Sequence, residues 1–77
     1  MGINELKDFQ VVAVSDVSGR DGMGIEVWSK EKILIEIFRD DENENFSITL
    51  FEESLPLKLI EESIEYFKRE IPKEFDK

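Results

Sequence analysis

The sequence predicts an α+β fold: a four-stranded antiparallel β-meander followed by one C-terminal α-helix packed on one face of the sheet, in the order ββββα. Two periodicities carry this prediction. Four segments between residues 9 and 51 are β-branched or alternate apolar with polar positions, which is typical of strands. Beyond them, apolar residues recur every three or four positions, which is typical of a helix. The 77 residues are expected to form one small domain, residues 1–77.

The first two strands are expected at residues 9–17 and 25–29. The sequence FQVVAVSDV is a β-branched run, and in IEVWS the side chains of Ile25 and Val27 share a face opposite that of Trp28. The segment SGRDGMG between them contains three glycines and is interpreted as a flexible hairpin connection. It is not a dinucleotide-binding motif, because its glycine spacing differs and it joins a strand to a strand.

The third and fourth strands are expected at residues 33–39 and 46–51. Both segments, ILIEIFR and FSITLF, alternate with period 2, and a polar turn separates them. Short connections between sequential strands favour antiparallel pairing of neighbours. The strand residues expected to face the helix are Ile25, Val27, Ile33, Ile35, Ile37, Phe46, Ile48 and Leu50.

The helix is expected at residues 55–71, with Pro56 in its first turn, where the missing N–H is not needed. Pro72 ends it, since the residue before a proline avoids the helical conformation. Its apolar stripe comprises Leu57, Ile60, Ile64, Phe67 and Ile71.

The sheet face opposite the helix is a candidate interface, because one helix cannot cover both faces and exposed aromatic surface often marks a binding site. The residues expected on this candidate interface are Trp28, Leu34, Phe38 and Phe51. Val12 and Val14 join them in one placement of the first strand. Association as a homodimer through this face is the prediction. The alternatives are that the sheet curls, or that segment 1–8 covers the face with Ile3 and Leu6.

Acidic residues are concentrated in the middle of the chain. The net charge is −9, and residues 40–65 hold nine acids and one base, which gives −8 for that block. Such a block repels phosphates, so binding to DNA or RNA is disfavoured, whereas a basic protein would be complementary. This suggests, as an alternative function, an acidic inhibitor or immunity-type protein that masks a basic partner. Its candidate surface comprises Asp40, Asp41, Glu42, Glu52, Glu53, Glu61, Glu62 and Glu65.

Residues 41–52, DENENFSITLFE, match part of the spacing of a calcium-binding loop. The matching positions are Asp41, Asn43, Asn45, Ser47, Thr49 and Glu52. However, Phe46 stands where that loop needs glycine for its sharp turn, and the flanking segments alternate like strands instead of forming helices. A hairpin tip accounts for every residue, so no metal site is predicted; weak, nonspecific cation binding at the tip is the alternative.

The composition argues against most catalytic chemistry. The chain has no cysteine and no histidine, which removes the usual zinc ligands, the commonest general base and the Ser-His and Cys-His nucleophile pairs. No segment is apolar over the length of a membrane span. The prediction is a non-enzymatic, cytoplasmic protein-interaction domain without cofactor and without membrane contact.

Overall fold

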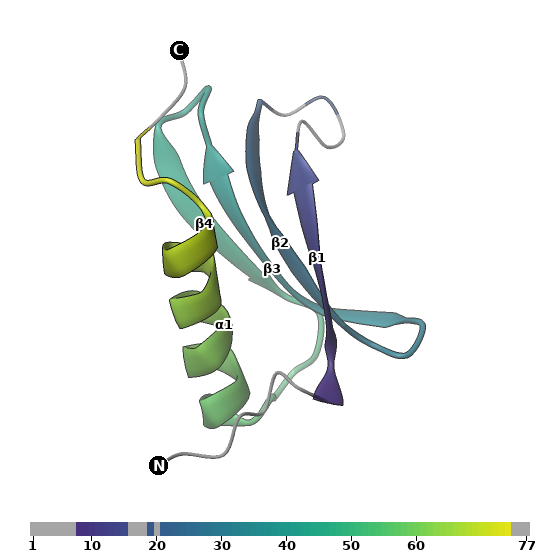
Figure 1. Ribbon diagram of the computed structural model, residues 1–77. Coiled ribbons are helices and arrows are strands. Elements are labelled where there is room, and N and C mark those ends of the chain that lie inside the picture. The colour runs from purple at the N-terminus through teal and green to yellow at the C-terminus, as the bar shows by residue number, and fades with distance from the viewer. Residues whose placement is uncertain (1–7, 16–18, 20, 75–77) are drawn as a thin grey trace.

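The predicted α+β architecture is confirmed by a computed structural model, which describes residues 8–15, 19 and 21–74. Four antiparallel strands form one sheet in the order of the sequence, and a single helix lies along one face, as Figure 1 shows. We call the helix-side face the inner face and the opposite face the outer face. The elements are β1 (Gln10–Ser15), β2 (Gly22–Ser29), β3 (Lys32–Asp40), β4 (Asn45–Leu50) and α1 (Leu57–Glu70).

Strand β2 begins at Gly22, not at residue 25, so two glycines of the predicted connection belong to the strand. Gly24 lies opposite Phe38 in the register, and a Cβ on it would be 2.8 Å from the Cα of Phe38 and would overlap the carbonyl oxygen of Ile37. This glycine therefore permits a close approach of two strands, and the interpretation of the segment as a flexible connection is wrong at this position. The end of the predicted first strand, residues 16 and 17, lies outside the described residues.

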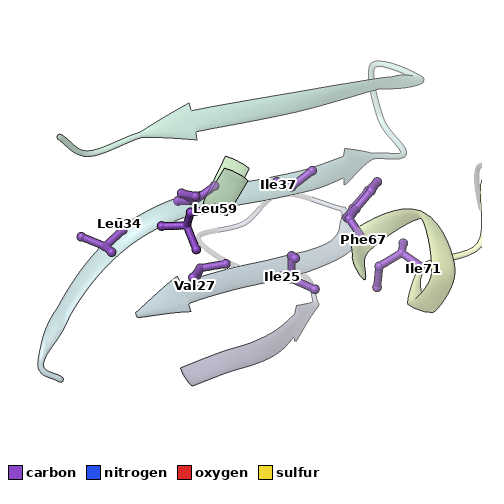
Figure 2. Packing of buried hydrophobic residues seen from close by; sticks show 8 residues of the cluster. Ile25, Val27, Leu34, Ile37, Leu59, Phe67 and Ile71 are labelled. Atoms are coloured by element: carbon purple, nitrogen blue, oxygen red, sulfur yellow. The ribbon is translucent and has the colours of Figure 1, made fainter. Parts of the chain in front are cut away.

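A β-bulge in β3 changes the face on which two predicted residues lie. Val27 is opposite Ile35 in the register. The next residue, Trp28, is opposite Ile33, so Leu34 is an extra residue in β3. Leu34 belongs to the buried core on the inner face (Figure 2), whereas Ile33 shares the outer face with Trp28. The predictions for the faces of Leu34 and Ile33 are therefore wrong, because a one-residue shift reverses the face of the residues beyond it.

The core lies between the inner face and α1, and it is built mainly from β2, β3 and the helix (Figure 2). Val11 in the edge strand β1 and Phe9 just before that strand also pack against the core. Burying each such side chain contributes roughly 1.5–3 kcal/mol. The buried cluster comprises Ile25, Val27, Leu34, Ile35, Ile37, Leu59, Phe67 and Ile71.

Helix α1 is rotated relative to the predicted stripe. Its buried residues are Leu59, Ser63 and Phe67, whereas Leu57, the first residue of the predicted stripe, is 70% exposed. Ser63 interrupts the apolar pattern, so periodicity alone does not place it in the core. Its hydroxyl donates a hydrogen bond to the carbonyl oxygen of Leu59 at 2.8 Å, which satisfies the buried polar atom. Pro56 occupies the N-cap position instead of the first turn.

Arg39, at the end of β3, holds the chain that follows the helix. Its Nε and Nη2 donate to the two carboxylate oxygens of Asp41 at 2.9 and 3.1 Å, and its Nη1 donates to the carbonyl oxygen of Pro72 at 2.9 Å. Arg39 and Asp41 are 5% and 8% exposed, respectively. This forked geometry suits an arginine, which can pair with a carboxylate through two nitrogens and still reach a third acceptor.

Candidate partner-binding groove

Strand β4 carries an apolar row that the helix covers only in part. Phe46, Ile48 and Leu50 alternate along β4, and their register partners on β3 place them on the inner face. Each is 45–49% exposed. The helix packs on β2 and β3 and reaches β4 less closely, so this row is only partly covered within one chain. Exposed apolar side chains in a contiguous row are more informative than scattered ones.

A groove lies between Phe46 and Ile48 of this row and the C-terminal half of the helix, and we call it the β4 groove. Its volume is about 360 Å³, and its lining includes Ile37 and Ile48 from the sheet and Ile64 and Ile71 from the helix side. The rings of Phe46 and Phe67 meet edge to face within it, with centroids 6.0 Å apart and planes at 86°. Such a pair is a favourable aromatic arrangement that fixes one wall of the groove.

The lining of the β4 groove has charge of one sign only. Lys68, in the last turn of the helix, and Lys73, just beyond it, are the two charged residues among those that line it. Both are exposed. The site therefore combines an apolar surface with two cations, which suits a partner that offers apolar side chains together with negative charge.

The predicted outer-face interface does not form one exposed apolar patch. Leu34 is in the core, and Phe38, although it lies on the outer face, is only 1% exposed. Trp28 is half-buried, and its indole Nε1 donates to Glu26 at 3.0 Å. Phe51 follows β4 and is 46% exposed. Two of the four side chains expected to contact a partner are thus buried within the chain itself.

The predicted acidic surface is divided by its local contacts. Asp41 is buried in the ion pair with Arg39, so it is not available to a partner. The carboxylate of Asp40 accepts hydrogen bonds from the backbone and side-chain nitrogens of Asn43 at 3.1 and 2.9 Å. Two acids have lysine partners: Glu52 pairs with Lys32, and Glu62 pairs with Lys58 at 3.9 Å. The exposed acids of the predicted surface are Glu42, Glu53, Glu61 and Glu65.

These exposed acids do not gather around the start of the helix. Glu42 lies in the β3–β4 turn, and the bond from Arg39 to Pro72 places that end of the sheet beside the end of the helix. Glu53 and Glu61 lie at the opposite end, where the helix begins. A helix of this length spans about 20 Å, so the hairpin acids and the acids near the helix start form separate groups.

Residues 41–52 form a hairpin tip and a strand, not a loop wrapped around an ion. Strand β4 starts at Asn45 and continues through Leu50 in regular antiparallel pairing with β3. Glu44 has φ of 52°, a left-handed conformation at the turn. In the part of the chain that the structure describes, no group of three or more acidic residues is arranged to hold a metal ion.

The fold and the groove together define a class: a small α+β domain whose single helix leaves an apolar groove beside an edge strand. No protein-family model matches the sequence, and neither a curated protein nor a solved structure is significantly similar to it. Within residues 8–15, 19 and 21–74, no helix has the length and apolar character that crossing a membrane requires.

Proposed function

We propose that this chain is a non-enzymatic protein-interaction domain that binds its partner at the β4 groove. One observation supports the proposal most directly: Phe46, Ile48 and Leu50 form an apolar row that is about half exposed on a chain with a buried core of its own. Side chains of this kind stabilise a complex when a partner removes them from water. The proposal includes a cytoplasmic location, as expected from the sequence.

The groove replaces the outer face as the site of the predicted association. On the outer face, Glu26 and Glu36 lie directly opposite each other in the β2–β3 register, and the outward residues of β4 are Asn45, Ser47 and Thr49. Both carboxylates are half-buried, and Glu26 accepts a hydrogen bond from Trp28, so a partner on that face would have to remove their remaining water, which is costly. The inner face of β4 requires no such desolvation.

The acidic-inhibitor alternative has weaker support. It requires one continuous acidic surface, but Asp41 is buried with Arg39 and the exposed acids lie in separate groups. Rim charges of this kind mainly raise association rates and set the salt dependence of binding. The acids thus modulate an interaction at the groove more readily than they form the binding site.

Site-specific photocrosslinking tests the proposal even when the identity of the partner is unknown. A photoreactive phenylalanine analogue replaces Ile48, on the groove side of β4, or Thr49, the next residue on the outer face. We expect a discrete covalent adduct from position 48 and none from position 49, and loss of the position-48 adduct when Ile64→Glu alters the opposite wall. Equal crosslinking from both positions, or from neither, would contradict the proposal.

A further inference from the structure

The lining of the β4 groove specifies what an occupant must offer. Apolar side chains are needed to cover Phe46 and Ile48, since a polar occupant would leave its own groups without hydrogen-bond partners there. Negative charge is needed next to that apolar segment, because Lys68 and Lys73 are the charged residues of the lining. An apolar segment bordered by acids meets both conditions.

Strand β4 of the same chain has this composition. Its inner side offers Phe46, Ile48 and Leu50, and exposed acids border it on both sides: Glu42 before the strand and Glu53 after it. We infer that the occupant of the β4 groove is β4 of a second copy of this chain, in a two-fold symmetric dimer. This inference rests on the proposed function, since it names the partner at the same site.

Two-fold symmetry makes the contact self-complementary. Each copy supplies both a groove and the strand that enters the partner's groove, so one mode of contact forms twice. Because acids border β4 at both ends, Lys68 and Lys73 of one copy meet a carboxylate of the other whether the two strands run parallel or antiparallel. The apolar rows of the two copies then cover each other next to the two helices. Ile48 of each copy lies close to the two-fold axis.

The same acids disfavour the alternative in which the two sheets join edge to edge. In an antiparallel pairing of two β4 strands, the residues before Asn45 of one copy lie opposite those after Leu50 of the other. That arrangement brings the end bearing Glu42 against the end bearing Glu53, and like charges across a strand pair are destabilising. When the inner faces of the two β4 strands pack against each other, these acids instead meet Lys68 and Lys73, so we expect face packing and not a merged sheet.

Absolute mass by light scattering on a sizing column tests the inference directly. The purified chain is run over a hundredfold range of concentration, because an interface built on one short strand from each copy is expected to be of modest affinity. We expect twice the monomer mass at the high end and a fall toward the monomer mass on dilution. A monomer at every concentration would overturn the inference.

Matched variants on adjacent residues locate the interface. Ile48→Glu places a carboxylate on the contact axis and is expected to raise the dimer dissociation constant at least about 100-fold. Thr49→Glu makes the same charge change on the outer face and is expected to change it less than about threefold. Circular dichroism confirms that both variants are folded. A dimer that survives Ile48→Glu would also overturn the inference.

The lysines provide a second test that does not disturb the apolar row. Lys68→Glu combined with Lys73→Glu is expected to weaken the dimer about tenfold more than Arg69→Glu combined with Lys58→Glu, which makes the same charge change at helix positions outside the groove lining. Equal effects of the two pairs would contradict the assigned role of the lysines.

The two proposals fail separately. If the purified chain is monomeric but the photocrosslinker at Ile48 joins it to a different protein, the groove is a binding site and the second copy is not its occupant. If the crosslinked adduct has twice the monomer mass, the occupant is a second copy. If the chain is monomeric and position 48 gives no adduct, both proposals are wrong.

Discussion

Strands β3 and β4 are neighbours with the same alternating pattern, yet one is buried and the other is exposed. Ile37 on β3 and Ile48 on β4 lie directly opposite each other on the inner face and are 5% and 45% exposed. The next such pair, Ile35 and Leu50, shows the same contrast, at 0% and 46%. A helix is about 10 Å wide and strands are about 4.8 Å apart, so one helix covers about two strands.

The position of the helix therefore decides which apolar row becomes core. Arg39 fixes the chain after the helix beside the end of β3 through the carbonyl of Pro72, and Leu59 and Phe67 pack among the side chains of β2 and β3. The same pattern of alternation produces a core strand beneath the helix and an exposed strand next to it. Whether an inner-face residue of a strand is buried thus depends more on where the helix lies than on the sequence of the strand.

Removing Arg39 should have the largest effect on this arrangement. Arg39→Ala leaves the carboxylate of Asp41 buried without its partner and releases the chain at Pro72, so we expect the free energy of unfolding to fall by about 3–5 kcal/mol. Urea denaturation followed by Trp28 fluorescence measures it. Arg69→Ala, at an exposed arginine that stacks 5.4 Å from the ring centre of Tyr66, is the control and should cost less than about 1 kcal/mol. Similar costs for the two would mean that Arg39 does not anchor the helix.

The pair of opposed isoleucines gives the next largest effect and the most direct test of the comparison. Ile37→Ala should lower the free energy of unfolding by about 2–5 kcal/mol, because it opens a cavity in the core, whereas Ile48→Ala should cost less than about 1.5 kcal/mol. Both are measured by urea denaturation at a concentration too low for association. Equal costs would show that β4 is as well covered as β3 in the single chain.

Amide hydrogen exchange within β4 should show the smallest effect. The N–H of Phe51 donates to the carbonyl of Leu34 at 2.9 Å, and in an antiparallel ladder this sets which alternate residues bond to β3. Ser47 and Thr49 then bond to β3, while the N–H of Ile48 points away from it. We expect Ile48 to exchange at least about tenfold faster than Thr49 in dilute solution. Equal rates measured by NMR would indicate that another segment pairs with β4.

The order of elements can be predicted from the sequence because each strand is β-branched or alternates, and the helix repeats with its own period. The bulge at Leu34 cannot be predicted from these patterns. In ILIEIF an isoleucine stands at every second position, so nothing in the pattern marks the residue at which β3 gains a position relative to β2. Gly22 and Gly24 lead to a wrong prediction for a related reason. Glycines are typical of turns, but these two lie within β2, where they allow β3 and the ring of Phe38 to approach closely.

The candidate site is harder to predict than the fold, because it depends on which residues the helix leaves uncovered. Alternation places Phe46, Ile48 and Leu50 correctly on the inner face, but it also leads one to expect that inner residues are core. The sequence indicates the site only through the helix, whose apolar residues extend over a wide part of its circumference. Leu57 and Ile64 lie on one side of the helix, and the buried residues Leu59 and Ser63 lie on another. A helix with apolar residues on more than one side cannot bury all of them against one sheet, so part of its apolar surface is left for another contact.

The bond between Arg39 and Pro72 also has a consequence in time. The two residues are 33 positions apart, and a ribosome that adds about 5–20 residues per second needs roughly 2–7 s to make the chain between them. During that interval the residues of β1, β2 and nearly all of β3 have been made, but the helix that covers their apolar face is still incomplete. Docking of the helix is therefore expected only after the three strands have been made, and their apolar face stays uncovered until synthesis has reached Pro72.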